Sequence, residues 1–334
     1  PVLVADATYL LTGGLGGLGL ALARWLAQHG ARELVLVGRA APRADQRAAI
    51  AGIEAAGARV HVMQADVADA GEAARVIAEV QARLPGLRGV SEVEDGWRIG
   101  ATTTLADLEA FAGQHAPTFT PLLRMLRYFA SRQIKNRATV GGNLCNASPI
   151  GDLAPVLMCL KGQVVLRSAV GSRRVPLDEF FLAYRQTELK AGEILEAVIV
   201  PELPANARAG AYKVSKRREL DISTVAGGFC VEVDEQGRVA AARLCFGGMA
   251  ATTARARSLE AALVGRPWTS AQVEAALPAL ATDFRPIDDA RGSAWYRRTV
   301  AENLVRGFVL ETRHVPIPNL SQRPSGTVHL EVVP

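Results

Sequence analysis

Over the first ninety residues, short apolar runs alternate with stretches of helical periodicity. The runs in TYLLT, ELVLVGR and VHVMQADV fit buried strands of a parallel sheet. In the stretch after the first run, Leu18, Leu22, Trp25 and Leu26 fall on one helical face, and RAAIAGIEAAG and AGEAARVIAEVQARL repeat the helical spacing. Strand and helix alternation of this kind predicts right-handed βαβ units around a parallel sheet.

From residue 91 onward the pattern changes to mixed strands and helices without that regular alternation. WRIGATTTLADLEAFAGQH is strand-like and then helical, with Thr103 or Thr104 as the N-cap. GFCVEVDEQGRVAAARLCFGG predicts a hairpin with DEQG as its turn. SLEAALVG, SAQVEAALPAL and AWYRRTVAENLVRGFVLETR are amphipathic helices. Residues 313–334 are a proline-containing tail with no assigned role.

Composition sets the class of protein. A chain of 334 residues with 49% hydrophobic and 21% charged residues is long enough for two domains and a substantial core. The net charge of +5 is spread over dispersed arginines, so we expect no nucleic-acid partner. No apolar run approaches the roughly 20 residues of a membrane helix. We expect a soluble, cytoplasmic protein.

The four cysteines form no CxxC pair and have no metal-site spacing with the histidines. This pattern fits buried thiols in a reducing compartment and predicts no metal site.

A glycine-rich turn separates the first predicted strand from the first predicted helix. Gly13, Gly17 and Gly19 would let backbone N–H groups approach a pyrophosphate at the helix N-terminus. Arg39, at the end of the second strand, is placed to accept the extra ribose phosphate of NADP. The alternative for Arg39 is an ordinary solvated surface residue.

TGGLGGLG matches the TGxxxGxG turn of short-chain dehydrogenases, and LVLVGR and ADVAD are similar to ketoreductase domains of polyketide synthases. The resemblance covers about residues 5–90 and implies NADPH binding by the glycines, Arg39 and Asp66, the last toward the adenine. The family's catalytic Ser and Tyr-x-x-x-Lys pair do not follow. YKVSK, Tyr212–Lys216, matches that spelling but lies among strand-like segments, so we interpret it as coincidence and assign no catalytic residue.

A second glycine pair occurs in ATVGGNLCNASPIGDLAPVLM. Gly141 and Gly142, flanked by Thr139 and Asn143, offer amide and hydroxyl donors to a phosphate, and Asp152 is placed to bond a ribose or adenine. A tight glycine bend between packed strands would explain the same composition.

That stretch, followed in order by EILEAVIVP, YKVSKRRELDIS and LCFGGMA, resembles the FAD-binding subunit or domain of xanthine dehydrogenase and carbon monoxide dehydrogenase flavoproteins. The resemblance covers about residues 87–312. It implies that Thr139, Gly141, Gly142 and Asn143 face the FAD pyrophosphate. It places Phe129, Asp152, Leu195 and Lys213 around the flavin and its nucleotide. From the residues alone, Lys213 is equally well a solvated strand lysine.

The resemblance also implies partners. Flavoproteins of this family begin with a subdomain carrying a first glycine-rich loop, and this chain joins the pattern after that loop. Iron–sulfur and molybdenum-binding parts are not recognisable in the sequence, so the resemblance implies separate subunits that carry them.

The phrase LRGV suits both families, which predicts a junction at about Leu87 to Ser91. The predicted fold is α/β plus α+β. A partial Rossmann βαβ segment (1–90) precedes a vanillyl-alcohol-oxidase-like (PCMH-type) FAD-binding subdomain (91–205), a small α+β C-terminal domain (206–312) and the tail (313–334).

Three functions remain open at this stage. The first is a composite of two oxidoreductase fragments that binds FAD, and NADPH weakly, with little turnover. The alternatives are a working FAD electron-transfer subunit and an NADPH-dependent ketoreductase.

Overall fold

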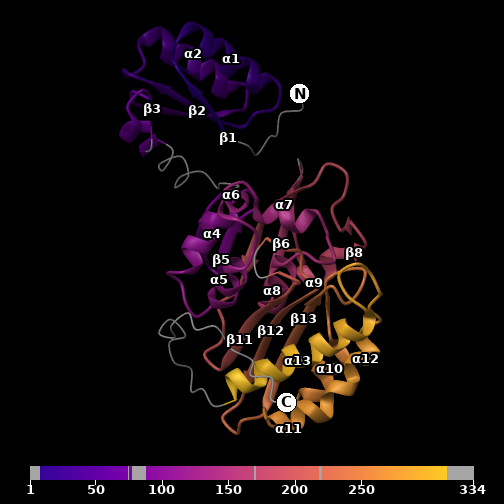
Figure 1. Cartoon of the computed structure of the whole chain (residues 1–334). Coiled ribbons are helices and arrows are strands. Elements are labelled where there is room, and N and C mark those ends of the chain that lie inside the picture. The colour runs from indigo at the N-terminus through magenta and orange to yellow at the C-terminus, as the bar shows by residue number, and fades with distance from the viewer. Residues whose placement is uncertain (1–7, 74, 77–87, 169–170, 218–219, 314–334) are drawn as a thin grey trace. The chain divides into compact units, whose positions relative to one another are not determined.

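The computed structural model describes residues 8–73, 75–76, 88–168, 171–217 and 220–313 (Figure 1). Contacts within the chain divide it into two compact units, with the division between residues 87 and 88. The third predicted helix, AGEAARVIAEVQARL, and the tail from residue 314 fall largely or wholly outside the described residues. Among the helices that are described, none has the length and apolarity needed to span a bilayer.

The first unit is a three-stranded parallel sheet with strand order β1-β2-β3 (Figure 1). Its elements are β1 (Thr8–Thr12), α1 (Gly17–Gln28), β2 (Glu33–Gly38), α2 (Ala44–Ala55) and β3 (Arg59–Gln64). Side chains from both helices and from the strands share one core cluster. The predicted βαβ alternation is therefore confirmed. Gly30, with φ of +105°, follows the end of α1, as expected for a residue that ends a helix in the left-handed region.

The helical face that carries Leu18, Leu22, Trp25 and Leu26 is buried only at Leu26. The α1 side chains that face the core are Ala23, Leu26 and Ala27. Leu18 and Trp25 are instead 86% and 41% exposed, and Leu22, between them on the same face, is also exposed. The helix lies on the sheet through small alanine side chains, and this rotation turns the larger apolar residues to the surface.

The second unit begins with a five-stranded sheet of order β4-β5-β10-β6-β7. Its strands are β4 (Val90–Val93), β5 (Gly96–Gly100), β6 (Gln163–Ser168), β7 (Gly171–Pro176) and β10 (Ile194–Val200). The helices that follow β5 are α4 (Leu105–Ala112), α5 (Thr120–Arg127), α6 (Arg132–Lys135), α7 (Val140–Cys145) and α8 (Leu153–Cys159). Thr104 is the N-cap of α4, with its side chain accepting the Asp107 N–H, so the cap falls on the second of the two predicted threonines.

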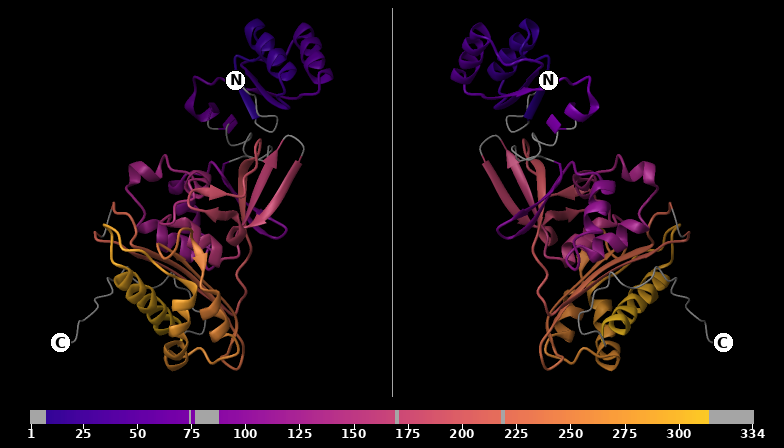
Figure 2. Two further views of the ribbon diagram at one scale, coloured as in Figure 1. Left: turned by 90° about the vertical axis from the view of Figure 1, so that its right-hand side faces the viewer. Right: turned by 90° about the vertical axis from the view of Figure 1, so that its left-hand side faces the viewer.

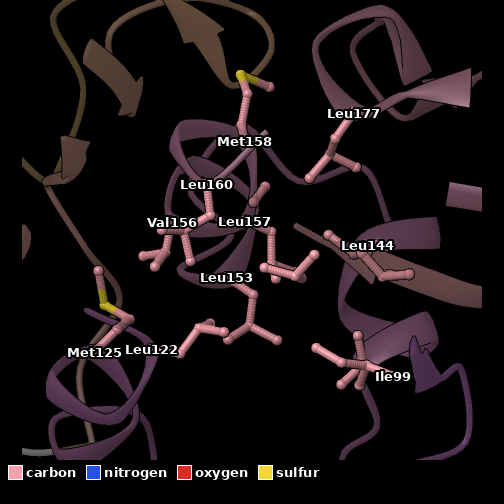
Figure 3. Close-up of a cluster of buried hydrophobic side chains, with 14 of the residues drawn as sticks. Ile99, Leu122, Met125, Leu144, Leu153, Val156, Leu157, Met158, Leu160 and Leu177 are labelled. Atoms are coloured by element: carbon pink, nitrogen blue, oxygen red, sulfur yellow. The ribbon is translucent and has the colours of Figure 1, made fainter. Parts of the chain in front are cut away.

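Helix α8 is the centre of this unit, because every one of its residues is buried. In Figure 3 its side chains point toward Leu122 and Met125 of α5 on one side and toward Leu144 of α7 and Ile99 of β5 on the other. The backbone of α8 also lies against strand β12 at Gly228, where an added Cβ would stand 2.2 Å from the Pro155 carbonyl oxygen. A side chain at that position would push the helix off the strand.

The second sheet is antiparallel with order β11-β12-β13-β14. Its strands are β11 (Ala207–Val214), β12 (Val225–Val233), β13 (Val239–Gly247) and β14 (Ala254–Arg255). The register of β12 on β13 confirms the hairpin predicted around DEQG. Helices α5 and α8 contact one face of this sheet. The other face carries α10 (Arg257–Leu263), α11 (Ser270–Ala276), α12 (Leu280–Asp283) and α13 (Ala294–Thr312) (Figure 2).

A charge cluster joins helix α9 (Leu177–Phe180), which follows β7, to strands β13 and β14 of the antiparallel sheet. Asp178, in α9, accepts Arg255 at 3.0 Å and lies 3.3 Å from guanidinium nitrogens of Arg243 and Arg257. Burial opposes ionisation of Asp178, but the hydrogen bond from Arg255 and the charges of Arg243 and Arg255 outweigh it and hold the pKa of Asp178 below its usual value. The carboxylate therefore ties the FAD-type half of this unit to β13 and β14.

We predict that Asp178→Asn lowers the free energy of unfolding by about 2 kcal/mol near neutral pH, because it removes the carboxylate charge that Arg243 and Arg255 share, although Arg255 keeps its pair with Glu260. Since the folded pKa is depressed, this contribution is complete above the usual carboxyl pKa of 3.8 and disappears as pH falls below it. Urea unfolding of both proteins across the acid range measures the difference. The exposed Glu274→Gln, which loses a surface pair with Arg306, is the control and should change stability little. A difference that persists unchanged into strong acid would contradict the assignment.

Candidate functional site

The structure gathers the residues predicted for NADP at one edge of the first sheet. Because β1, β2 and β3 are parallel, their carboxyl ends meet there. Gly13, Arg39 and Asp66 each follow one of these ends, and Arg39 and Asp66 are exposed. Asp66 is partly occupied by the local chain, because its Oδ1 accepts the Ala68 N–H at 3.1 Å. The position of Arg39 fits a phosphate contact and a solvated residue equally.

Glycine is present at each position of this turn for a different structural reason. Gly13 has φ of +64°, a left-handed conformation that favours glycine. At Gly19, an added Cβ would lie 2.5 Å from the Gly13 carbonyl oxygen, so glycine is required for α1 to begin so close to the turn. Gly17 has open space around its Cα, and Gly16 caps α1 with no side-chain hydrogen bond. The first turn of α1 therefore presents backbone amides that no capping side chain uses.

The second glycine pair starts α7, and both of its amides already donate within the protein. Thr139 is the N-cap, and its Oγ1 accepts the Gly142 N–H at 3.1 Å. The Gly141 N–H donates to the Ala101 carbonyl oxygen at 2.7 Å. The family resemblance implies that these amides face a pyrophosphate, but in this structure both donate to oxygen atoms of the protein itself.

The two glycines also differ in the space around them. At Gly141 an added Cβ would lie 2.9 Å from the Ala101 carbonyl oxygen, so this glycine is needed for close packing of α7 on β5. Gly142 is exposed, and an added Cβ would meet only Thr139 Oγ1, at 3.0 Å. Next along the helix, Asn143 Oδ1 is buried without a hydrogen-bond partner. An open glycine beside an unsatisfied buried oxygen fits the binding of a polar group at this point.

Asp152 and Lys213 form a buried ion pair. Asp152 precedes α8 and Lys213 lies on β11, and the Lys213 Nζ donates to Asp152 Oδ2 at 2.6 Å. Their side chains are only 7% and 4% exposed, so Lys213 is not a solvated strand lysine. The hydroxyl of Ser223 donates to the other carboxylate oxygen of Asp152 at 2.5 Å. The ammonium group also lies 5.9 Å from the centre of the Phe129 ring.

A cavity of about 350 Å³ adjoins this pair. Its wall is formed by the C-terminal half of α5, by β11 and by α13, and it includes Lys213, Tyr128 and Arg217. Volumes of this order hold small ligands. Leu195, the remaining residue predicted for the flavin, is buried in β10, which contacts α7. The structure therefore brings Phe129, Asp152 and Lys213 together and leaves Leu195 in the core nearby.

Tyr212 and Lys216 match the Tyr-x-x-x-Lys motif of ketoreductases, but their side chains have separate partners. Tyr212 lies on a strand, and its hydroxyl donates to Glu311 Oε2 at 2.9 Å. Burial and the neighbouring Glu311 carboxylate raise the pKa of Tyr212 well above its usual value. The Lys216 ammonium donates to the Ala290 carbonyl oxygen at 2.6 Å, so it does not activate the tyrosine. This geometry supports the interpretation that the spelling is coincidental.

The cysteines are free and differ in exposure. Cys145, at the end of α7, is exposed, whereas Cys159, Cys230 and Cys245 are buried. Burial raises the pKa of the Cys230 thiol to about 12 and raises those of Cys159 and Cys245 well above the usual value for a thiol. In the part of the chain that the structure describes, His, Cys, Asp and Glu form no cluster able to hold a metal ion.

Comparison with protein families assigns each part of the chain. Residues 7–98 match the KR domain family. Residues 69–203 match the FAD binding domain in molybdopterin dehydrogenase. Residues 210–312 match the C-terminal domain of the CO dehydrogenase flavoprotein. The first two matches overlap between residues 69 and 98, around the predicted junction.

Individual relatives agree with this assignment. The chain is 35% identical over 253 residues to xanthine dehydrogenase of Emericella nidulans and 36% identical over 238 residues to xanthine dehydrogenase/oxidase of Gallus gallus. These alignments cover 72% and 68% of this chain but only 18% of each relative. A carbon monoxide dehydrogenase structure from Hydrogenophaga pseudoflava has the same fold, with TM-score 0.62 and 23% identity over 91% of this chain and 96% of that one.

Together these findings show that the larger part of the chain is an FAD-binding region of the flavoprotein type. More particularly, the chain joins a ketoreductase-domain segment to the FAD-binding and C-terminal domains of the xanthine and carbon monoxide dehydrogenase flavoprotein family. FAD is the cofactor of that family region, and the ketoreductase segment makes NADP(H) a possible second one.

Sequence reasoning did not single out Ser223 or the unsatisfied oxygen of Asn143. Ser223 ends the motif YKVSKRRELDIS, but nothing in the spacing shows that its hydroxyl reaches a carboxylate 71 positions earlier. Asn143 was expected to face the pyrophosphate, but its unpaired Oδ1 is a hydrogen-bond acceptor, which fits a donor group and not a phosphate oxygen.

We predict that Gly142→Val removes FAD binding at a smaller cost in melting temperature than a substitution at Gly141, because its added Cβ would meet only Thr139 Oγ1, at 3.0 Å, on the exposed side where a phosphate would approach. Gly141→Ala is the matched variant, and overpacking against Ala101 should lower its stability by about 1–3 kcal/mol. FAD titration by fluorescence and thermal melting of each variant separate the two effects. Unchanged FAD binding by Gly142→Val would show that the cofactor does not use this loop.

Proposed function

We propose that the chain binds FAD weakly in its second unit and NADPH weakly in its first, and catalyses little turnover by itself. In the second unit, Lys213, Phe129 and the α7 start would hold the FAD, with Asn143 donating or accepting at the polar part of the cofactor. Bound FAD would supply two-electron redox chemistry, and the protein's share would be position and electrostatics. In this proposal the chain consists of a truncated NADP-binding segment (1–90), an FAD-binding subdomain (91–205), a C-terminal α+β domain (206–312) and a tail (313–334).

The observation that carries the proposal is the engagement of both glycine amides of α7. Gly141 donates to Ala101 and Gly142 donates to Thr139, so neither amide is available to a pyrophosphate without rearrangement. Hydrogen bonds to charged groups are worth about 1.5–3 kcal/mol each, so two missing donors reduce affinity by about two to four orders of magnitude. This supports weak FAD binding over tight retention.

A second candidate function is an FAD electron-transfer subunit that works with iron–sulfur and molybdenum-binding subunits. The buried Asp152–Lys213 pair beside a cavity favours it, because burying a charge pair is unfavourable unless its position is used or well compensated. The relatives named above span a much longer chain, so both the electron-transfer role and these partners are proposals for this one. Ketoreduction is disfavoured, because Tyr212 and Lys216 have other partners.

We expect FAD to be lost during gel filtration and to bind again when added in excess. The absorbance of the purified protein between 350 and 500 nm, roughly the region in which oxidised flavins absorb, tests the first part. Quenching of flavin fluorescence during titration tests the second. Stoichiometric yellow protein directly from the column would contradict weak binding and favour the electron-transfer subunit.

For the first unit we expect measurable NADPH binding and weaker NADH binding, because Arg39 would contact the ribose phosphate that distinguishes the two. Arg39→Ala should reduce NADPH affinity by about tenfold and leave NADH affinity unchanged. Isothermal titration of both cofactors measures this preference. Arg43→Ala, in an exposed cap position four residues away, is the control and should keep the preference. Equal binding of the two cofactors by the unmodified chain would remove the role given to Arg39.

A further inference from the structure

Ser223 lies at the buried end of the Asp152–Lys213 pair. Its side chain donates to Asp152 Oδ1 at 2.5 Å, and the residue is 1% exposed. Lys213 donates to the other oxygen, Oδ2, at 2.6 Å. One buried carboxylate is therefore shared between a neutral hydroxyl and an ammonium group, each with its own oxygen.

The division of the two oxygens has a geometric consequence. A carboxylate is free to turn about its Cβ–Cγ bond, and a single cationic partner can draw both oxygens toward itself. The Ser223 hydroxyl keeps Oδ1 on its own side, which leaves Oδ2 alone for Lys213. Without the hydroxyl, Oδ1 would be a buried acceptor lacking a partner, an unfavourable state that the carboxylate relieves by turning out of its present position and so out of line with Lys213.

The backbone beside Ser223 is held independently of that hydroxyl. The Thr224 N–H donates to the Val214 carbonyl oxygen at 2.8 Å, which joins the segment to the strand that carries Lys213. The Thr224 carbonyl oxygen accepts Arg297 Nη1 at 2.6 Å, and Arg297 in turn donates to Asp289 at 2.7 Å. Arg297 is 2% exposed, so this support is internal to the fold. Ser223 therefore remains in place when its hydroxyl is removed.

We propose that Ser223 is a positioning residue of the flavin site. It holds the Asp152 carboxylate so that the Lys213 ammonium stays at the cavity wall as a fixed positive charge. This inference rests on the proposed binding of FAD and adds a residue that acts through Asp152 without touching the cofactor. A fixed positive charge beside a flavin favours its reduced, more negative form.

The first experiment needs no cofactor. Reductive methylation of the full chain, followed by peptide mass spectrometry, gives the rate at which Lys213 is modified, with the exposed Lys190 as internal reference. We expect Ser223→Ala to raise the Lys213 rate by about tenfold, the factor that corresponds to one hydrogen bond to a charged group. Ser223→Thr keeps a hydroxyl and should keep the wild-type rate. Equal Lys213 rates in the wild-type and alanine proteins would overturn the proposal.

The second experiment uses protein loaded with excess FAD and measures the midpoint potential of the bound flavin. We expect a lower potential in Ser223→Ala and an unchanged one in Ser223→Thr. Thr253→Val is the matched control, since Thr253 Oγ1 is equally buried and has no hydrogen-bond partner. A potential that does not move in Ser223→Ala would refute the effect on the flavin. Failure of the wild-type chain to bind FAD would instead refute the proposed function, and the methylation rates would still decide the role of Ser223.

Discussion

The close approach of α8 to strand β12 is the constraint on which the second unit depends. An added Cβ at Gly228 would lie 2.2 Å from the Pro155 carbonyl oxygen, so helix and strand touch backbone to backbone. This contact sets the height of α8 above the sheet. It therefore sets the position of Asp152, immediately before α8, relative to Lys213 on β11. A shift of the helix by the width of one methyl group would separate the buried ion pair.

The charges in this unit follow from the same arrangement. Two sheets that share a helical layer leave polar side chains with little access to water, and each such group needs a partner inside. Asp152 pairs with Lys213 and Ser223, and Asp178 pairs with Arg243 of β13, Arg255 of β14 and Arg257 of α10. The buried pairs thereby fix how the FAD-type half and the C-terminal half fit together.

Local sequence patterns were sufficient to predict much of the secondary structure and the family of the larger part. The periodicity of hydrophobic residues and the positions of turn residues predicted the βαβ segment, the β12–β13 hairpin and the C-terminal helices. Four motifs indicated the flavoprotein family. The sequence was insufficient where tertiary contacts decide which side chains are buried and which partners they have. Leu18, Leu22 and Trp25 share one helical face, but their spacing could not show that α1 packs through Ala23, Leu26 and Ala27 and leaves those three side chains exposed. Likewise, the sequence could not show that Gly141 packs on Ala101, or that Ser223 reaches Asp152.

The uneven exposure of the cysteines has a practical consequence for work on the flavin loop. Cys145 stands two positions after Asn143 on α7 and is exposed, although its partial burial raises the pKa of its thiol, whereas the other three thiols are buried out of reach of a reagent. A maleimide dye added to the native chain would therefore attach at Cys145 without any engineered substitution. Its emission would then report on events at the α7 start in real time, including the binding of a cofactor.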